Sequence, residues 1–152
     1  MELTKNTTLT DNGRSSGMFT PKDALSEFDA GFLYEESCRA WVLYKLHGIK
    51  MNCPGCRTEL PYNKTRSFWD CRRIKCDRCG KYFTALTDTF LSGAHFNFRE
   101  IVLLSLLIAL GVADKQIAAI LKISTENVRL WRHRFESIAQ AQKISSGERN
   151  GN

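Results

Sequence analysis

Two Cys-x-x-Cys pairs constrain this chain more than any other feature of its sequence. Nineteen residues separate Cys53-Pro-Gly-Cys56 from Cys76-Asp-Arg-Cys79, a spacing typical of four-cysteine zinc sites. Each pair can form a tight turn that directs both sulfurs to one side, and a hairpin can bring two such turns together as a tetrahedron. We therefore expect a zinc ribbon in which one structural Zn²⁺ is bound by Cys53, Cys56, Cys76 and Cys79.

A closed four-cysteine site leaves no open coordination position, so the expected zinc stabilises the fold and does not catalyse hydrolysis. About 35 residues cannot bury enough apolar surface alone, whereas structural zinc contributes roughly 10–16 kcal/mol to small fingers. The competing interpretations are a redox pair, which would need only one Cys-x-x-Cys, and an iron–sulfur cluster, whose ligand spacing usually differs.

The remaining cysteines and the histidines show no ligand spacing of their own. Cys71 lies in a strand-like run, 66–75, and Cys38 lies in the expected first helix, and we interpret both as small buried residues. We interpret His47, His95 and His133 as surface or packing residues. His47 could replace a cysteine ligand only in an unusual ribbon.

The chain has 152 residues, which is room for one ordinary domain or two very small ones, and a net charge of +6. Residues 1–49 hold 5 basic and 7 acidic residues, residues 50–84 hold 9 and 3, and residues 85–152 hold 8 and 6. The cysteine-rich middle therefore carries the basic excess, about +4 once four thiolates bind one Zn²⁺. Such an excess favours polyanionic partners, although a basic solvated surface gives the same count.

No targeting segment is evident in the sequence. The first twenty residues lack the apolar core of a secretory signal, and the longest apolar run, 101–112, is shorter than the about 20 residues that cross a bilayer. In a reducing cytoplasm, six cysteines favour metal binding over disulfides.

The pattern predicts a small α+β protein in five segments. These are a disordered tail (1–20), an N-terminal helical segment (21–49) with a helix from about Ser26 to Leu46, the zinc ribbon and a linker (50–96), a three-helix domain (97–142) and a second disordered tail (143–152).

The last helices match a helix-turn-helix. We expect one helix from Phe98 to Leu110 that ends at Gly111, a second from Lys115 to Leu121 capped by Asp114, and a third capped by Ser124. Lys122 stands in the turn where glycine is usual, so it would need a positive φ. The apolar positions fall where this motif places its core: Ile117, Ala118, Leu121, Ile123, Val128 and Trp131.

The third helix has one apolar seam and one polar face. Its seam is Val128, Trp131, Phe135 and Ile138, which predicts that Trp131 is a core residue and not a base-stacking one. In a DNA major groove Thr125, Glu126 and Arg129 would reach base edges, while Arg132 and His133 would lie nearer phosphates. The alternative is a solvated face of a small helix bundle. The candidate DNA-binding residues of this helix are Ser124, Thr125, Glu126, Arg129, Arg132 and His133.

The expected ribbon supplies a second basic surface. Its candidate phosphate contacts are Arg66, Arg72, Arg73, Lys75, Arg78 and Lys81. We interpret the interleaved aromatic residues, Phe68, Trp69, Tyr82 and Phe83, as the core of the hairpin.

These features occur in an order that resembles the N-terminal DNA-binding region of a family of bacterial insertion-sequence transposases. The matching features span roughly residues 30–140, and the sequence has isoleucine at 74 and aspartate at 88 where that family commonly has an aromatic residue and glycine. The matching segments are an acidic helix with Glu35, Glu36, Cys38 and Leu46, then Cys53-Pro-x-Cys56, Ile74-Lys75-Cys76-x-x-Cys79-Gly80-Lys81-x-Phe83-Thr84 and Thr87-Asp88-Thr89-Phe90.

The resemblance implies recognition of DNA without strand-transfer chemistry. In such transposases a separate RNase-H-like domain follows, in which three acidic residues hold two metal ions. We expect no such domain here, and we find no nucleophile paired with a base, no glycine-rich phosphate loop and no His-Glu metal motif. The expected protein is therefore not an enzyme.

We expect a bacterial, cytoplasmic and nucleoid-associated protein that binds double-stranded DNA sequence-specifically, as a transcriptional regulator. A module this small reads few bases, so we expect a homodimer or a protein partner, with the first helix as the interface. The alternatives are an accessory or truncated transposition protein that binds element ends, and a protein–protein adaptor of the transcription machinery. No membrane or small-molecule partner is predicted.

Overall fold

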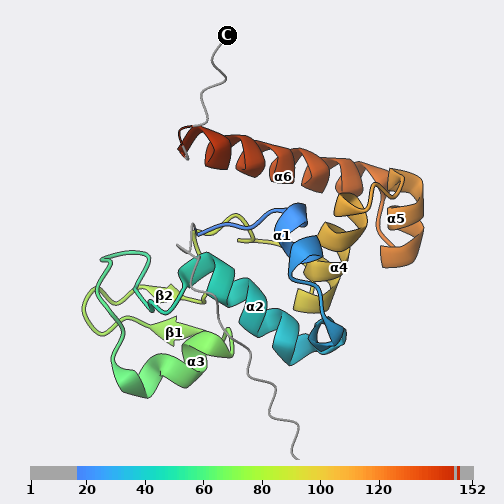
Figure 1. The fold of residues 1–152 in the computed structure, drawn as a ribbon. Coiled ribbons are helices and arrows are strands. Elements are labelled where there is room, and N and C mark those ends of the chain that lie inside the picture. Colours follow the sequence, from blue (N-terminus) through green and yellow to red (C-terminus); the bar gives the residue numbers. More distant parts are fainter. Residues whose placement is uncertain (1–16, 146, 148–152) are drawn as a thin grey trace, which may run out of the picture.

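The computed structural model describes residues 17–145 and 147 and folds them into a mostly helical α+β structure (Figure 1). The small α+β class is confirmed at this level. Among these residues, the one sheet is the antiparallel pair of β1 and β2, and no helix combines the length and apolar character needed to cross a bilayer. The elements are α1 (Pro21–Ser26), η1 (Ala30–Leu33), α2 (Glu35–His47), η2 (Tyr62–Lys64), α3 (Thr65–Trp69), β1 (Ile74–Lys75), β2 (Tyr82–Phe83), α4 (Phe98–Ala109), α5 (Asp114–Leu121) and α6 (Thr125–Ser145).

The N-terminal segment is divided into three short elements, so the prediction of one helix from Ser26 to Leu46 is wrong. α1 starts at Pro21, where the Thr20 amide and hydroxyl both donate to the Asp23 carboxylate. The Asp29 carboxylate accepts a hydrogen bond of 2.6 Å from the amide of Gly31 and starts η1. A side chain that binds the backbone in this way competes with helical hydrogen bonds, so the chain turns before α2 begins.

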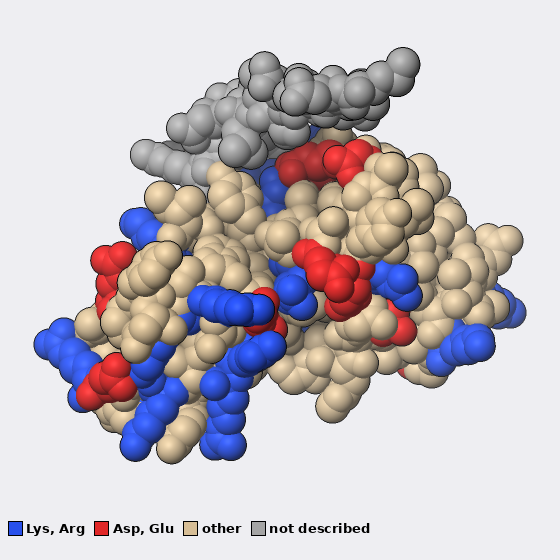
Figure 2. Space-filling model, turned by 90° about the horizontal axis from the view of Figure 1, so that it is seen from below, with Lys and Arg blue, Asp and Glu red and all other residues tan. Residues whose placement is uncertain are grey.

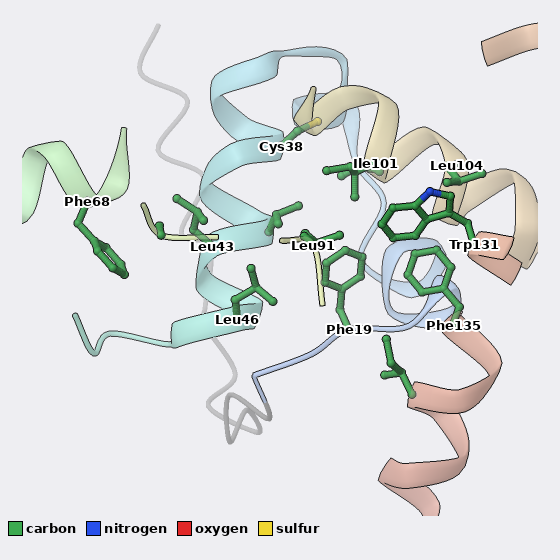
Figure 3. Close-up of a cluster of buried hydrophobic side chains, with 14 of the residues drawn as sticks. Phe19, Cys38, Leu43, Leu46, Phe68, Leu91, Ile101, Leu104, Trp131 and Phe135 are labelled. Atoms are coloured by element: carbon green, nitrogen blue, oxygen red, sulfur yellow. The ribbon is translucent and has the colours of Figure 1, made fainter. Parts of the chain in front are cut away.

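The chain joins the core before residue 20, earlier than the predicted end of the N-terminal tail. The Phe19 ring is fully buried, with centroids 5.0 Å from Trp41, 5.1 Å from Phe90 and 6.0 Å from Phe135 (Figure 3). Residues 1–16 of that tail lie outside the described residues. At the other end α6 continues to Ser145, past the predicted boundary at 142, and residues 146 and 148–152 are also outside the described part.

The strand-like run 66–75 is mostly not a strand. Thr65–Trp69 form α3, which buries Phe68, and only Ile74 and Lys75 form β1. Between them Cys71 has φ +55°, a left-handed conformation that ends the helix and reverses the chain. The run therefore contains a helix, a turn and a two-residue strand.

The start of α4 is capped from a distant part of the chain. Glu35 Oε1 accepts from the Phe98 amide at 2.9 Å and Oε2 accepts from the Arg99 amide at 3.0 Å. Asn97 and Glu100 satisfy each other's amides in a capping box. All four orphan amides at this helix end are thus paired, and the Glu35 carboxylate ties α2 to α4.

The turns between the last three helices follow most of the sequence predictions. Gly111 has φ +73° just after α4, Lys122 has φ +55° after α5, and the Ser124 hydroxyl accepts from the Asn127 amide at 3.1 Å to cap α6. Asp114 is not the cap of α5. Ala113 holds that position, and Asp114 is the first helical residue, which leaves its carboxylate free to bind a neighbouring helix.

One continuous hydrophobic core joins the cysteine-rich half to the three last helices. Figure 3 shows Leu43 and Leu46 of α2, Leu91 of the connecting segment, and Ile101 of α4 around Phe19. The predicted seam of α6 is confirmed, since its four residues are all buried: Val128, Trp131, Phe135 and Ile138.

His47 packs at the end of α2, as predicted, and not among the clustered cysteines. Its Nε2 lies 2.5 Å from the carbonyl oxygen of Ala85, and its ring meets Phe68 edge-on at 5.0 Å. Desolvation by burial lowers the pKa of His47 below the ordinary 6.5, and the hydrogen bond to Ala85 opposes that shift.

The Glu35 cap generates a stability prediction. Glu35→Ala removes the acceptor of two helix-end amides and should lower the free energy of unfolding by about 1–2 kcal/mol. Urea unfolding followed by circular dichroism measures this. Glu36→Ala is the matched control, because Glu36 is the exposed neighbour with the same charge on the same helix end. Equal losses for the two variants would contradict the capping role.

The buried imidazole of His47 generates a pH prediction. Because its folded pKa lies below 6.5, the unfolded chain binds the proton more readily, and stability falls as pH drops below 6.5. His47→Gln cannot gain this proton. Its unfolding free energy should therefore fall less than that of the wild type between about pH 7.5 and about pH 5.5 in urea titrations. Identical losses in both proteins would exclude this contribution.

Candidate metal centre and basic surfaces

The four cysteines of the two pairs converge on one point. Their Sγ atoms all lie within 4.8 Å of one another, with Cys53 Sγ 3.6 Å from Cys79 Sγ and Cys56 Sγ 3.7 Å from Cys76 Sγ. A regular tetrahedron with metal–sulfur bonds of about 2.3 Å has edges of about 3.8 Å. The observed separations therefore fit four ligands around one tetrahedral ion.

Both cysteine pairs fold into the same turn. In the first, the Arg57 amide donates to the Cys53 carbonyl at 2.8 Å, and in the second the Gly80 amide donates to the Cys76 carbonyl at 2.9 Å. The residue after each second cysteine is left-handed, with φ +59° at Arg57 and +76° at Gly80. Glycine adopts this conformation without strain, whereas arginine adopts it at a cost.

The pKa shifts of the cysteines differ within the cluster as well as outside it. A hydrogen bond with the Lys81 backbone lowers the pKa of Cys79, but desolvation by burial and the neighbouring cysteines outweigh it and raise this pKa to about 11. Hydrogen bonds with Thr58, side chain first and then backbone, lower the pKa of Cys56 to about 6. Desolvation by burial raises the pKa of Cys38 to about 11 and also raises the pKa of Cys71. Cys38 is fully buried and Cys71 half-buried, in accord with their interpretation as packing residues.

A set of four thiolates closes the coordination sphere, which is the chemistry of a structural metal site. Such an ion would link the segment before η2 to the segment after β1. The two strands contain only two residues each, so this ion would be the main cross-link in this half of the chain.

The basic side chains of the cysteine-rich half fall into two groups. Most candidate phosphate contacts already have a partner: Arg66 and Arg72 lie 3.8 Å and 3.7 Å from Asp70, and Lys81 lies 3.0 Å from Asp88. Arg78 Nη1 donates to Thr58 Oγ1 at 2.8 Å. Arg73 and Lys75 instead lie against the ring of Tyr82. In Figure 2 basic side chains gather at the end of the molecule that holds β1, β2 and α3.

The aromatic residues of this half are core residues with one clear exception. Phe68 and Phe83 are buried, as predicted, whereas Trp69 is half-buried and packs against the edge of the core. Tyr82 is 53% exposed, which the core prediction did not include.

The candidate DNA-binding residues at the start of α6 are mostly exposed, and one of them, Arg132, is engaged inside the protein. Ser124, Glu126, Arg129 and His133 are exposed, and Thr125 is half-buried. Arg129 lies 3.3 Å from Glu126 and 3.7 Å from Asp114 but keeps 57% of its side chain exposed.

Arg132 is committed to an internal contact between α5 and α6. Its Nε and Nη2 atoms donate to Asp114 Oδ1 at 3.0 Å and 2.7 Å, and Nη2 also donates to the Val112 carbonyl at 3.2 Å. Half-buried, charge-assisted pairs of this geometry are stronger than exposed ones. Arg132 therefore fixes the angle between the two helices, a role that was not predicted from the sequence.

Two contacts have no local sequence signal, namely the Glu35 cap and the Asp114–Arg132 pair, and the exposure of the Tyr82 ring was also missed. The first two join residues 63 and 18 positions apart. Tyr82 could have been found from strand alternation, because it directly precedes the buried Phe83.

No protein-family model, curated protein or solved structure matches this chain in the comparisons made with known proteins. The candidate site is therefore argued from its own geometry.

The cysteine cluster generates a metal-content prediction. Cys76→Ser should lose the bound metal and the structure of residues 50–86, because one of four ligands is removed. Elemental analysis of the purified protein and circular dichroism measure both. Cys38→Ser is the control, since this buried thiol only donates to the Phe32 carbonyl at 3.2 Å, a bond that a hydroxyl can also make. Stoichiometric metal in the Cys76→Ser protein would refute the ligand set.

Proposed function

We propose that this chain is a zinc-stabilised protein that binds double-stranded DNA sequence-specifically and acts as a transcriptional regulator. The observation that carries the proposal is the exposed polar start of α6, held by a buried seam on one side and by the Asp114–Arg132 pair on the other. The resemblance to transposase DNA-binding regions supports the same role, in which the chain recognises DNA and performs no strand transfer.

The metal is zinc in this proposal. Four thiolate ligands in a tetrahedral arrangement favour Zn²⁺ over harder ions such as Mg²⁺ and Ca²⁺. Zinc has no redox chemistry, and the closed ligand set gives it no substrate position. It would stabilise the cysteine-rich half and keep its basic residues in place.

The α5–α6 pair supports a helix-turn-helix. Ile117, Ala118 and Val128 are buried where that motif places its core, and Lys122 takes the left-handed conformation of its turn. Such a motif lays its second helix in the major groove, with N-terminal residues facing base edges. Glu126 and Arg129 would then accept from cytosine and pair with guanine.

We also propose that the active form is a homodimer or binds a protein partner, because one module of this size reads a short sequence. The segment nominated as the interface exposes Phe28, Leu33 and Tyr34 by 50%, 65% and 65%. Light scattering of the DNA-bound protein tests this proposal. A monomer on DNA at micromolar concentration would exclude it.

In vitro selection from a random duplex library, with zinc-loaded protein at physiological salt, tests the DNA-binding proposal. We expect an enriched motif, and a spaced palindrome if the protein is a dimer. Loss of all DNA from folded, zinc-loaded protein would refute DNA binding and favour the adaptor function.

Two arginines should behave differently on the selected site. Arg129→Ala should cost about 1–3 kcal/mol and relax the preference at one position, because Arg129 would pair with a base. Arg73→Ala should weaken binding to all sequences and lower the salt slope by about one, because it would contact phosphate. Competition binding over a range of salt concentrations measures both.

Gln140→Ala is the control for these variants, because Gln140 is exposed on the C-terminal half of α6, away from the proposed contact. If the Arg129 and Arg73 variants showed the same pattern of losses, the assignment of base and phosphate contacts would be wrong.

A further inference from the structure

The two short strands form a hairpin with one buried and one exposed face. Ile74 and Phe83 are register partners and are both buried, whereas Lys75 and Tyr82 are register partners and both exposed. Side chains of opposed residues on one face of a sheet lie close enough to interact. Arg73, exposed just before β1, extends the outer face.

Two cations are gathered around the Tyr82 ring. The Arg73 guanidinium carbon lies 4.5 Å from the ring centroid, and Lys75 Nζ lies 5.6 Å from it. Both distances are within the about 6 Å range of cation–π attraction. The ring therefore restricts two long side chains that would otherwise sample many rotamers.

These two cations differ from most neighbouring basic side chains in having no acidic partner. Among the described residues, neither Arg73 nor Lys75 lies within ion-pair distance of a carboxylate. The neighbouring acidic groups are already paired: Asp70 with three arginines, Asp77 with Lys64 and Asp88 with Lys81. The outer face of the hairpin thus presents two positive charges and a tyrosine hydroxyl with no acid to neutralise them.

We propose that this face, Arg73, Lys75 and Tyr82, binds the phosphodiester backbone of duplex DNA, with Tyr82 acting as the platform that positions the two cations. This inference rests on the proposed function and deepens it. It assigns Tyr82, which the sequence had placed in the core, to the contact with DNA. Adjacent phosphates on one strand match a pair of neighbouring cations, and a tyrosine hydroxyl is a common phosphate donor.

The hairpin and the exposed start of α6 lie at opposite ends of the molecule (Figure 1). In Figure 1 α6 runs along the top, with its first residues beside α5, while β1 and β2 lie at the lower left. The hairpin therefore contacts backbone outside the base pairs that α6 reads. Its contribution is independent of base sequence and depends on salt.

The test is a set of variants on the full chain, with binding measured by fluorescence anisotropy on one duplex that carries the selected motif and on one unrelated duplex. Tyr82→Ala should weaken binding to both duplexes by roughly two- to fivefold, the equivalent of an exposed cation–π contact. Tyr82→Phe keeps the ring and should lose less. Tyr62→Ala is the matched control, because Tyr62 is 92% exposed in the same half of the chain and has no cation against it.

A double-mutant cycle separates positioning from a simple change of surface. If Tyr82 acts by placing Arg73, the losses for Tyr82→Ala and Arg73→Ala are not additive, and Tyr82→Ala costs little in the Arg73→Ala protein. Zinc content and circular dichroism of each variant confirm that the exposed substitutions leave the fold intact.

The outcomes distinguish this inference from the function it rests on. If the wild type binds neither duplex, the DNA-binding proposal fails. If the wild type binds and Tyr82→Ala behaves as Tyr62→Ala does, the hairpin assignment alone fails. The same variants are also measured on a single strand of the selected duplex. A greater loss for Tyr82→Ala on the single strand than on the duplex would overturn the hairpin assignment, since the ring would then stack on bases.

Discussion

The convergence of four cysteine side chains is the constraint on which the cysteine-rich half depends. Its sheet contains two residue pairs, and its core contributes a few buried side chains such as Leu60, Phe68 and Phe83. So little buried surface cannot offset the entropy of ordering about 35 residues. A metal ion held by the two turns would supply the cross-link that the core does not, and would fix the positions of the basic residues.

The two halves of the molecule share one core. Phe19 lies between Trp41, Phe90 and Phe135, and the Glu35 carboxylate caps α4 from the start of α2. These contacts set the orientation of the exposed face of α6 relative to the hairpin. The spatial relation between the two candidate DNA surfaces is therefore a property of the packing and is not left to a linker.

Local chemistry explains what could be predicted from the sequence. The left-handed Lys122 and the Ser124 cap depend on residues a few positions apart, and the convergence of the four cysteines follows from two Cys-x-x-Cys turns at a characteristic spacing. Residue type and spacing are therefore sufficient to predict them. The break in the first helix was missed because Asp29 bends the backbone locally within an otherwise helical pattern. Arg132 was assigned to phosphate because its acidic partner becomes visible only once α5 and α6 are packed together.

The Glu35 cap also determines whether the last three helices can fold without the rest of the chain. A helix whose first amides are satisfied by a residue 63 positions earlier cannot be excised with its ends intact. A fragment limited to residues 97–145 would leave these amides to solvent and would expose the side of Trp131 and Phe135 that packs on Phe96, Phe19 and Phe90. The last three helices thus resemble a module in sequence pattern but not in physical independence, and recombination that transferred them alone would transfer an incomplete fold.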